Sequence, residues 1–245
     1  MNDMYTSPFP TLNFPSFAST NQSENLAYEA RHEDMCWWLD SSRREEFQNQ
    51  PHINIYSGNG GLSDQDQAKL HSESPIAQID EAAREPSGTE HWEDSDNVIV
   101  LAEHPYILYA TSAENNKIPI GFIQFNLSIR YYDVEKSISV NCNIERIYAA
   151  KKNRRQHVGA ALIFATAEVI QKHCEDVLSQ CKFMPKSYPT VEALDIYIYA
   201  ELHSEEGENM MSLLNSQLEI FKDDFEMESE GDKIKIKGVD LDVGF

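Results

Sequence analysis

The most informative part of this 245-residue sequence is residues 144–162, which read IERIYAAKKNRRQHVGAAL. A strand pattern ends in this stretch, a basic loop follows at residues 151–155, and a helix then begins after Gln156 with small residues. The first N–H groups of a helix lack intrahelical acceptors, and the helix dipole adds partial positive charge there. The stretch therefore predicts a site for the phosphates of an anionic ligand, although it is neither a Walker loop nor a dinucleotide fingerprint.

The sequence that follows this loop predicts a helix, a strand, a second helix and a hairpin. Apolar residues recur at helical spacing over residues 158–173, so one face of this helix is expected to lie against a sheet. Residues 191–200 are predicted as a buried strand and residues 209–221 as a helix. The end of the chain is predicted as a hairpin, with Phe225 and Met227 on one strand and residues 233–237 on the other.

The sequence from residue 98 to the loop is rich in strand patterns, and the N-terminal region before residue 98 has a different character. The predicted strands are residues 98–102, 106–111, 118–125 and 137–150. Gly121 within the third strand indicates a bulge or a close approach of another segment. Residues 24–48 are predicted as a helix, residues 53–56 as a short strand and residues 64–83 as a polar helix. Residues 1–22 show no period and are predicted to be a mobile arm.

The charge of the chain restricts its partners. Twenty basic and 41 acidic side chains give a net charge of −21, and the acidic excess lies in residues 1–95 and 191–245. Such a balance disfavours nucleic acid and anionic membranes, and it favours a cationic amine or a basic protein. The Trp37-Trp38 pair is interpreted as core or as a partner surface, and a homodimer is left open.

Other compositional signals point to a protein of the cytoplasm without a metal site. The four cysteines have no repeated spacing and are expected to be reduced thiols. The start of the chain has no basic region followed by an apolar run, and no stretch is long and apolar enough for a membrane span. We expect a cytoplasmic protein that binds neither membranes nor metals.

The segment from Gln156 to Ala161 resembles the pyrophosphate loop of the GNAT N-acetyltransferase superfamily, Gln/Arg-x-x-Gly-x-Gly/Ala, which grips acetyl-CoA. The resemblance extends over residues 106–221. It implies an α/β fold with a mixed, mainly antiparallel twisted sheet flanked by helices and preceded by an N-terminal helical extension. It also implies three parts: the arm at residues 1–22, a helical extension at 23–95 on the acceptor side, and an acetyltransferase domain at 96–245.

The resemblance implies roles for individual residues. N–H groups near residues 148–150 would polarise the acetyl carbonyl, and the following loop and helix would hold acetyl-CoA. Glu145, which lies 11 residues before Gln156, takes the place of the catalytic base of histone-type members and is expected to be half-buried with a raised pKa. Glu103, His104 and Glu201 are rivals for this role. The implied cofactor-binding residues are Tyr148, Ala149, Ala150, Arg154, Arg155, Gln156, His157, Val158, Gly159, Ala160, Ala161 and Asn209.

The sequence departs from the family pattern at the general acid. The usual tyrosine position falls on Ser216, so Tyr199, His203 or water is left for that role. The implied activity is transfer of the acetyl group from acetyl-CoA to a primary amine by direct attack. The amine is open: a lysine, a protein N-terminus, a polyamine or an aminoglycoside fits the charge. The alternative is an acidic, non-catalytic protein of the same fold, acting as a DNA mimic, a partner inhibitor or an acetyl-CoA sensor.

Overall fold

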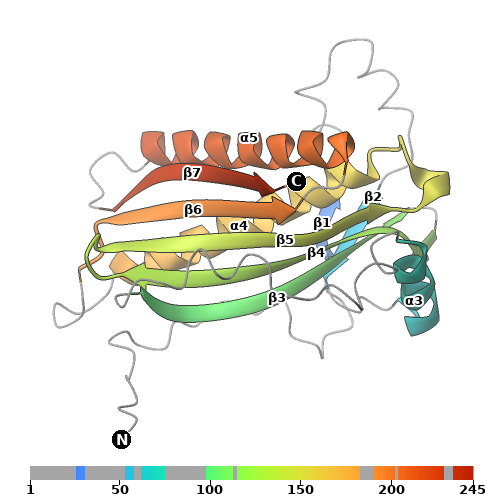
Figure 1. Ribbon diagram of the computed structural model, residues 1–245, viewed down its shortest axis with the longest axis horizontal. Helices are drawn as coiled ribbons and strands as arrows, with labels where there is room; N and C mark the ends of the chain where they lie inside the picture. Colours follow the sequence, from blue (N-terminus) through green and yellow to red (C-terminus); the bar gives the residue numbers. More distant parts are fainter. Residues whose placement is uncertain are drawn as a thin grey trace, which may run out of the picture.

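The structure, a computed structural model, describes residues 26–30, 53–57, 62–74, 98–112, 115–182, 190–201, 204–228 and 234–244. Seven strands of this part form one sheet whose order in space, β1 to β7, is their order in the chain (Figure 1). They are β1 (Leu26–Ala30), β2 (Ile53–Ser57), β3 (Val98–Ser112), β4 (Asn115–Tyr132), β5 (Ser137–Ala149), β6 (Ala193–Glu201) and β7 (Lys235–Gly244). Neighbours from β1 to β5 are antiparallel, whereas β5–β6 and β6–β7 are parallel.

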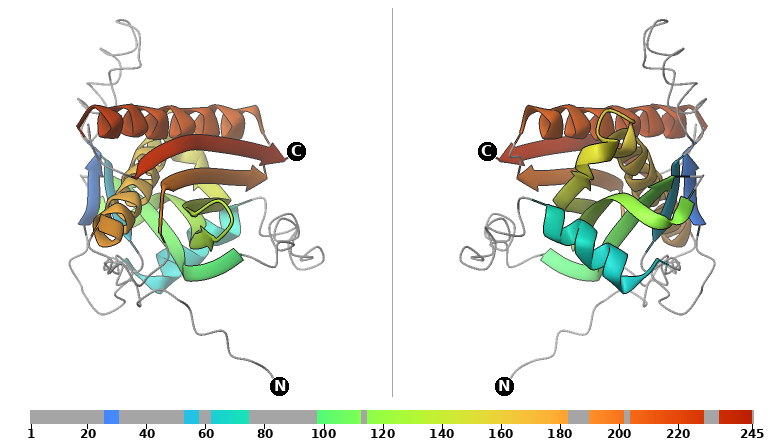
Figure 2. Two further views of the ribbon diagram at one scale, coloured as in Figure 1. Left: turned by 90° about the vertical axis from the view of Figure 1, so that its left-hand side faces the viewer. Right: turned by 90° about the vertical axis from the view of Figure 1, so that its right-hand side faces the viewer.

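Helices lie on both faces of the sheet. The helices α4 (Val158–Lys182) and α5 (Glu205–Glu228) cover one face, and the short helix α3 (Asp64–Glu73) lies on the other near one end (Figure 2). A 3-10 turn, η2 (Lys151–Asn153), leads into α4. The predicted mixed α/β class with a mainly antiparallel sheet is confirmed by these strand pairings.

The main core fills the space between the sheet and α4. Alternate residues of β4, such as Phe125 and Leu127, point into it, and so do Ile196 and Ile198 of β6. Because α4 is apolar around most of its circumference, fifteen of its residues are buried. A second, smaller core lies on the α3 side and consists of Leu62, Leu70, Tyr109, Phe122, Tyr148 and Ala150.

Gly121 of β4 is the point where α4 approaches the sheet. A Cβ atom at this position would lie 2.6 Å from Val158 Cγ1 and 2.8 Å from the carbonyl oxygen of Tyr148. Neither contact is possible without a shift, so only glycine lets the first residue of α4 pack on this part of the sheet. The predicted close approach at Gly121 is therefore confirmed.

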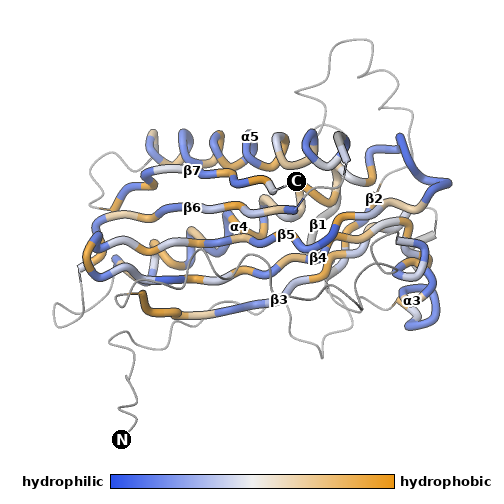
Figure 3. The backbone as a smooth tube through the Cα atoms, in the orientation of Figure 1, coloured by the Kyte–Doolittle hydropathy of each residue, from blue (hydrophilic) through white to orange (hydrophobic). Residues whose placement is uncertain are grey.

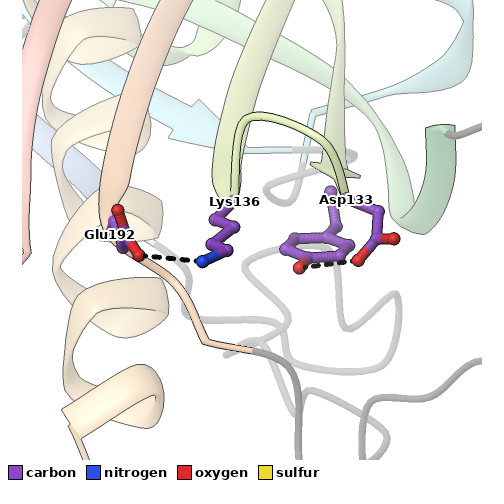
Figure 4. A network of polar contacts seen from close by, with 4 residues as sticks. Asp133, Lys136 and Glu192 are labelled. Carbon is purple, nitrogen blue, oxygen red and sulfur yellow. Dashed lines mark hydrogen bonds and ion pairs between the residues drawn. The ribbon is translucent and has the colours of Figure 1, made fainter.

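The turn between β4 and β5 is tied to the start of β6. Lys136 has a φ of 50°, and its carbonyl accepts the Glu192 N–H at 2.8 Å. The Lys136 Nζ lies 3.3 Å from a Glu192 carboxylate oxygen, and on the other side of the turn the Tyr131 hydroxyl donates to Asp133 (Figure 4). These contacts hold the entry of β6 against the start of β5, where the parallel pairing begins at Ser137 and Ala193.

Two sequence predictions about the ends of the chain are wrong. Residues 26–30 form a strand paired with β2, not a helix, because pairing at a sheet edge outweighs a local helical pattern. The terminal hairpin is also absent: Phe225 and Met227 belong to α5, and β7 pairs in parallel with β6. The apolar residues of α5 recur at helical spacing through Phe225, with Met211, Leu214 and Leu218 buried.

Other predicted segments lie partly or wholly outside the described residues. These are the arm at residues 1–22, residues 31–48 of the predicted first helix and residues 75–83 of the predicted polar helix. The helix α3 confirms the start of that polar helix, and Figure 3 shows its hydrophilic character. In the described part, no helix is both long enough and apolar enough to cross a bilayer, and no group of three or more potential metal ligands is found.

Candidate functional site

The strands β5 and β6 separate before β5 ends. Their parallel pairing runs from Ser137 and Ala193 to Ile144 and Ala200, and β6 ends one residue later. The strand β5 continues to Ala149 and stays paired with β4 on its other side. Residues 145–149 therefore have one edge that no described part of β6 covers, and we call this uncovered edge the β5 gap.

Backbone N–H groups of β5 point into the β5 gap. The N–H of Ala150 donates to the Ile120 carbonyl on the β4 side at 2.9 Å. Successive backbone groups of a strand point to opposite edges, so the N–H groups of Ile147 and Ala149 point away from β4. Of the N–H groups near residues 148–150 that were predicted to face a ligand, that of Ala149 points into the gap, whereas that of Ala150 bonds to β4. That such groups bind a ligand stays a prediction.

Glu145 is the extra residue of a β-bulge at the start of the gap. Gln124 pairs with Arg146 and Phe125 pairs with Ile144, so Glu145 has no partner residue on β4. Its carboxylate accepts a hydrogen bond from the Gln124 side-chain amide. The expected half-burial of Glu145 is wrong: the preceding Ile144 points into the core, so strand alternation puts Glu145 on the open face of the sheet, where its side chain is exposed.

The loop between β5 and α4 is basic and exposed, and Figure 3 shows its hydrophilic character. Lys151, Lys152, Arg154 and Arg155 are all exposed, and the Arg154 guanidinium lies 6.0 Å from the centre of the Tyr148 ring. Inside the loop, Asn153 Nδ2 donates to Gln156 Oε1 at 3.0 Å, so this bond uses the acceptor oxygen of a predicted cofactor-binding side chain and not its N–H donors. Arg155 and His157 have φ values of 63° and 57°, so the loop takes a defined turn into α4.

The first turn of α4 offers backbone groups rather than side chains. The His157 carbonyl accepts the Ala161 N–H at 2.9 Å, so the N–H groups of residues 158–160 precede the first helical bond. Val158, Ala160 and Ala161 are buried in the core, and only their backbone can meet a ligand. A Cβ on Gly159 would lie 3.2 Å from Met210 Sδ, so this glycine lets α5 approach α4 closely.

The second half of the sheet brings further candidate residues to the same end. Asn209 is exposed on α5, next to the Met210 that touches Gly159. Tyr199 lies on the face that carries Glu145, opposite Asn143 of β5, and its hydroxyl donates to Glu201 at 3.5 Å. Burial, Glu201 and Asp242 raise the pKa of Tyr199.

Two further positions bear on the general acid: the candidate His203, and Ser216 at the position of the usual family tyrosine. His203 lies outside the described residues. The Ser216 hydroxyl donates to the Ser212 carbonyl of its own helix at 2.9 Å, so it is occupied within α5.

The rivals of Glu145 on β3 are placed elsewhere. His104 stacks on His173 of α4, with ring centroids 5.8 Å apart, so it belongs to the opposite face of the sheet from Glu145. Glu103 is exposed and pairs with Ser128, four residues along β4 from Gln124. Of the three rivals, only Glu201 lies near the β5 gap, at the end of β6.

His71 of α3 is a residue near the site that sequence reasoning missed. Its Nε2 lies 2.8 Å from the Tyr109 hydroxyl, and its ring centroid is 4.1 Å from that of Phe122. Burial and the Arg146 guanidinium lower the pKa of His71. His71 follows Leu70, which is buried on the inner face of a polar helix. This apolar neighbour was the feature of the sequence that could have indicated that His71 lies against the sheet.

The comparisons with known proteins include a distant structural likeness. No protein-family model matches the chain, and no curated protein matches it. Among solved structures, the chain is similar to an aminoglycoside acetyltransferase, meta-AAC0020, from an uncultured soil metagenomic sample, in complex with trehalose. The identity is 12%, the match covers 67% of this chain and 86% of that chain, and the TM-score is 0.29. This likeness is too distant to assign a role to any residue of the site.

Proposed function

We propose that the protein is an N-acetyltransferase that moves the acetyl group of acetyl-CoA to a primary amine. The observation that carries the proposal is the β5 gap, which opens beside the first turn of α4 and the basic loop. A strand edge with outward N–H groups suits the amide-containing arm of acetyl-CoA. Four exposed basic side chains and the N–H groups of residues 158–160 suit its phosphates.

The same geometry supports direct attack by the amine. The N–H groups of Ile147 and Ala149 would donate to the acetyl carbonyl oxygen and stabilise the negative charge that forms there. Glu145 would accept a proton from the attacking amine as the new C–N bond forms. As the C–S bond breaks, the leaving thiolate needs a proton. Tyr199 would supply it, because a tyrosine hydroxyl at its ordinary pKa is already protonated at neutral pH and this one lies on the same face of the sheet as Glu145.

A cationic acceptor fits the other side of the gap. The open face of β7 carries Asp240 and Asp242, and Glu201 follows at the end of β6. These carboxylates would attract an amine that is protonated at neutral pH and so raise its local concentration. The acceptor class proposed is therefore a cationic amine, without a choice among lysine, N-terminus, polyamine and aminoglycoside.

The direct test is calorimetric titration of the full chain with acetyl-CoA. We expect micromolar binding for the wild type and at least about tenfold weaker binding for the double variant Lys152→Glu/Arg154→Glu, which reverses two charges of the loop. Lys172→Glu on α4 is the control for charge reversal away from the loop, since Lys172 is exposed and its ion pair with Glu175 lies on the helix surface. Folded wild-type protein that does not bind acetyl-CoA would end the proposal.

A second candidate function is an acetyl-CoA sensor that binds without turnover. The observation in its favour is Ser216, which bonds to its own helix backbone at the position where a general acid was sought. The titration distinguishes this candidate only together with an assay for acetyl transfer to a panel of amines. Binding without transfer to any amine would favour the sensor.

A further inference from the structure

The strand β7 is the last strand of the sheet and has one free edge. Among the described residues it pairs with β6 and with no other strand. Its sequence is KIKGVDLDVG, so the basic residues lie in its first half and the acidic residues in its second half. An unpaired edge presents backbone N–H and C=O groups that can bond to another strand.

The side chains of β7 divide between two faces. Lys235, Lys237, Asp240 and Asp242 are exposed, whereas Ile236 and Val239 are buried against the core. Neither lysine forms an ion pair with another described residue. The register with β6 shifts between Ile236 and Gly238, so Lys237 is the extra residue of an irregularity.

The edge is complementary to itself when two copies run antiparallel. With a two-fold axis at Val239, this residue faces its own counterpart, and Ile236 faces the partner's Leu241. The irregularity at Lys237 then brings Lys235 opposite the partner's Asp242 and Lys237 beside the partner's Asp240. Each lysine meets an aspartate, and apolar residues meet on the core face. Opposite charges placed across strands stabilise pairing, and like charges oppose it.

We propose that the chain forms a homodimer in which β7 pairs antiparallel with β7 of a second copy. The interface is isologous, because each strand offers the other the same basic half and the same acidic half. An in-register parallel pairing would place lysine against lysine and aspartate against aspartate, so it is disfavoured. The sheet becomes continuous across both copies, and the free edge of each is removed.

The dimer would also reach the candidate site. Asp242 pairs in register with Tyr199 of β6, and a Cβ on Gly244 would lie 3.6 Å from the Tyr199 hydroxyl. The proposed register places the partner's Lys235 beside Asp242. A lysine of the second copy would therefore stand close to Tyr199 at the edge of the site.

The test is sedimentation velocity of the full chain over a concentration series, at an ionic strength of about 0.15 M, where charges farther apart than about 8 Å are screened. Wild type is expected to be a dimer. In the variant Lys235→Asp/Lys237→Asp every charged side chain of β7 is acidic, and in the variant Asp240→Lys/Asp242→Lys every one is basic. Each variant alone places like charges across the interface, so each is expected to dimerise at least about tenfold more weakly than wild type.

The mixed sample is the decisive arm. An equimolar mixture of the two variants restores every opposite-charge pair, so it is expected to form heterodimers. The variant that carries all four substitutions keeps the net charge of −21 and should dimerise as wild type does. Lys69→Asp on α3 serves as a control for charge reversal away from the strand, since Lys69 is exposed there. Circular dichroism checks that every variant is folded.

Three results would overturn the proposal. The first is a wild type that stays monomeric at about 100 μM, a concentration far above the Kd of a stable dimer. In that case the two lysines would prevent β7 from pairing with another strand, as lysines on edge strands often do. The second is a dimer that neither double variant weakens, because another face must then form it. The third is a mixture that fails to associate although each variant is folded.

Discussion

Gly121 shows how one residue sets the position of the helix that follows β5. Its Cα faces the first residue of α4 at a separation that leaves no room for a methyl group. Gly121→Ala is expected to lower the free energy of unfolding by roughly 1–3 kcal/mol, because the helix must move or strain the strand. Urea unfolding followed by circular dichroism measures this difference.

Gly238→Ala is the matched control for this substitution. A Cβ at Gly238 would meet only Asp240 Oδ2, at 3.8 Å, which is an ordinary contact. A small effect at both glycines would mean that α4 does not depend on the close approach at Gly121.

Glu145 is the other residue whose position follows from one local feature, the β-bulge. Under the proposed function, Glu145→Gln is expected to lower kcat/KM for the amine by roughly 10²–10⁴, because the amide cannot accept the proton. Acetyl-CoA binding should be unchanged, since the amide keeps the size and the hydrogen-bonding capacity toward Gln124. The measurement is the steady-state rate of thiol release with an amine acceptor.

Glu103→Gln is the control for the Glu145 substitution. Glu103 is an exposed glutamate of the same sheet, away from the β5 gap, and its replacement should leave the rate unchanged. Equal rates for Glu145→Gln and the wild type would remove Glu145 from the mechanism.

At the scale of the element, the packing of α4 on the sheet includes a buried histidine. His173 is almost fully buried, and its Nε2 lies 2.5 Å from the Tyr106 hydroxyl of β3. Burial, and then the neighbouring His104, lower the pKa of His173 to about 4. Asp176 also acts on this cluster, since it contributes to the raised pKa of Tyr106.

This histidine makes the stability of the helix–sheet contact depend on pH. The unfolded chain binds a proton near the ordinary pKa of 6.5, whereas the folded chain binds it only near pH 4. The stabilising effect is therefore complete above pH 6.5 and is lost as the pH falls toward 4. Between pH 7.5 and pH 5, the loss should be on the order of 2 kcal/mol.

The measurement is urea unfolding of the wild type and of His173→Gln at both pH values. The variant should show a smaller loss between them, and comparing the two proteins cancels the effects of the other titrating groups. Tyr106→Phe keeps the buried imidazole and should retain the dependence on pH. An equal pH dependence in the wild type and His173→Gln would show that His173 does not titrate in this range.

Helices and strands with a regular pattern of apolar residues could be predicted from the sequence. Those whose conformation depends on pairing with another segment of the chain could not. The pattern of residues 137–150 and 158–173 gave β5 and the start of α4 because each buries one regular set of side chains. The strand β1 could not be found, since its conformation depends on pairing with β2. The end of α5 was misassigned because alternation over Phe225 and Met227 is too short to exclude a helix.

The candidate site was predictable in its backbone and less so in its side chains. The strand end, the basic loop and the helix start follow from the order of the sequence. The exposure of Glu145 follows from the alternation of β5, in which Cys142 and Ile144 are buried. That Glu145 has no partner on β4 depends on where the β4–β5 register shifts, and no pattern in either strand marks that point. His71 contacts Tyr109 of the sheet because α3 packs there. The polar sequence of α3 does not indicate which of its faces packs on the sheet.

At the scale of the whole molecule, basic and acidic side chains occupy different places at the end of the sheet where β5 and β6 separate. The basic loop follows β5, whereas exposed carboxylates lie on β6 and β7. This separation fits the proposed reaction, in which one substrate carries phosphates and the other carries a protonated amine. The proposed dimer would join two such ends through their acidic and basic strand halves.

The order of the strands also bears on how the chain can assemble during synthesis. Each described strand pairs with the one made just before it, and none is inserted between two earlier strands. A chain that leaves the ribosome can therefore extend its sheet one strand at a time, with the N-terminal strands already paired. Among the described strands, β7 is the last to be made and adds to the edge that β6 offers. In a homodimer built on β7, the pairing of two subunits would thus follow the formation of the other six described strands, and nascent chains that lack β7 could not pair through it.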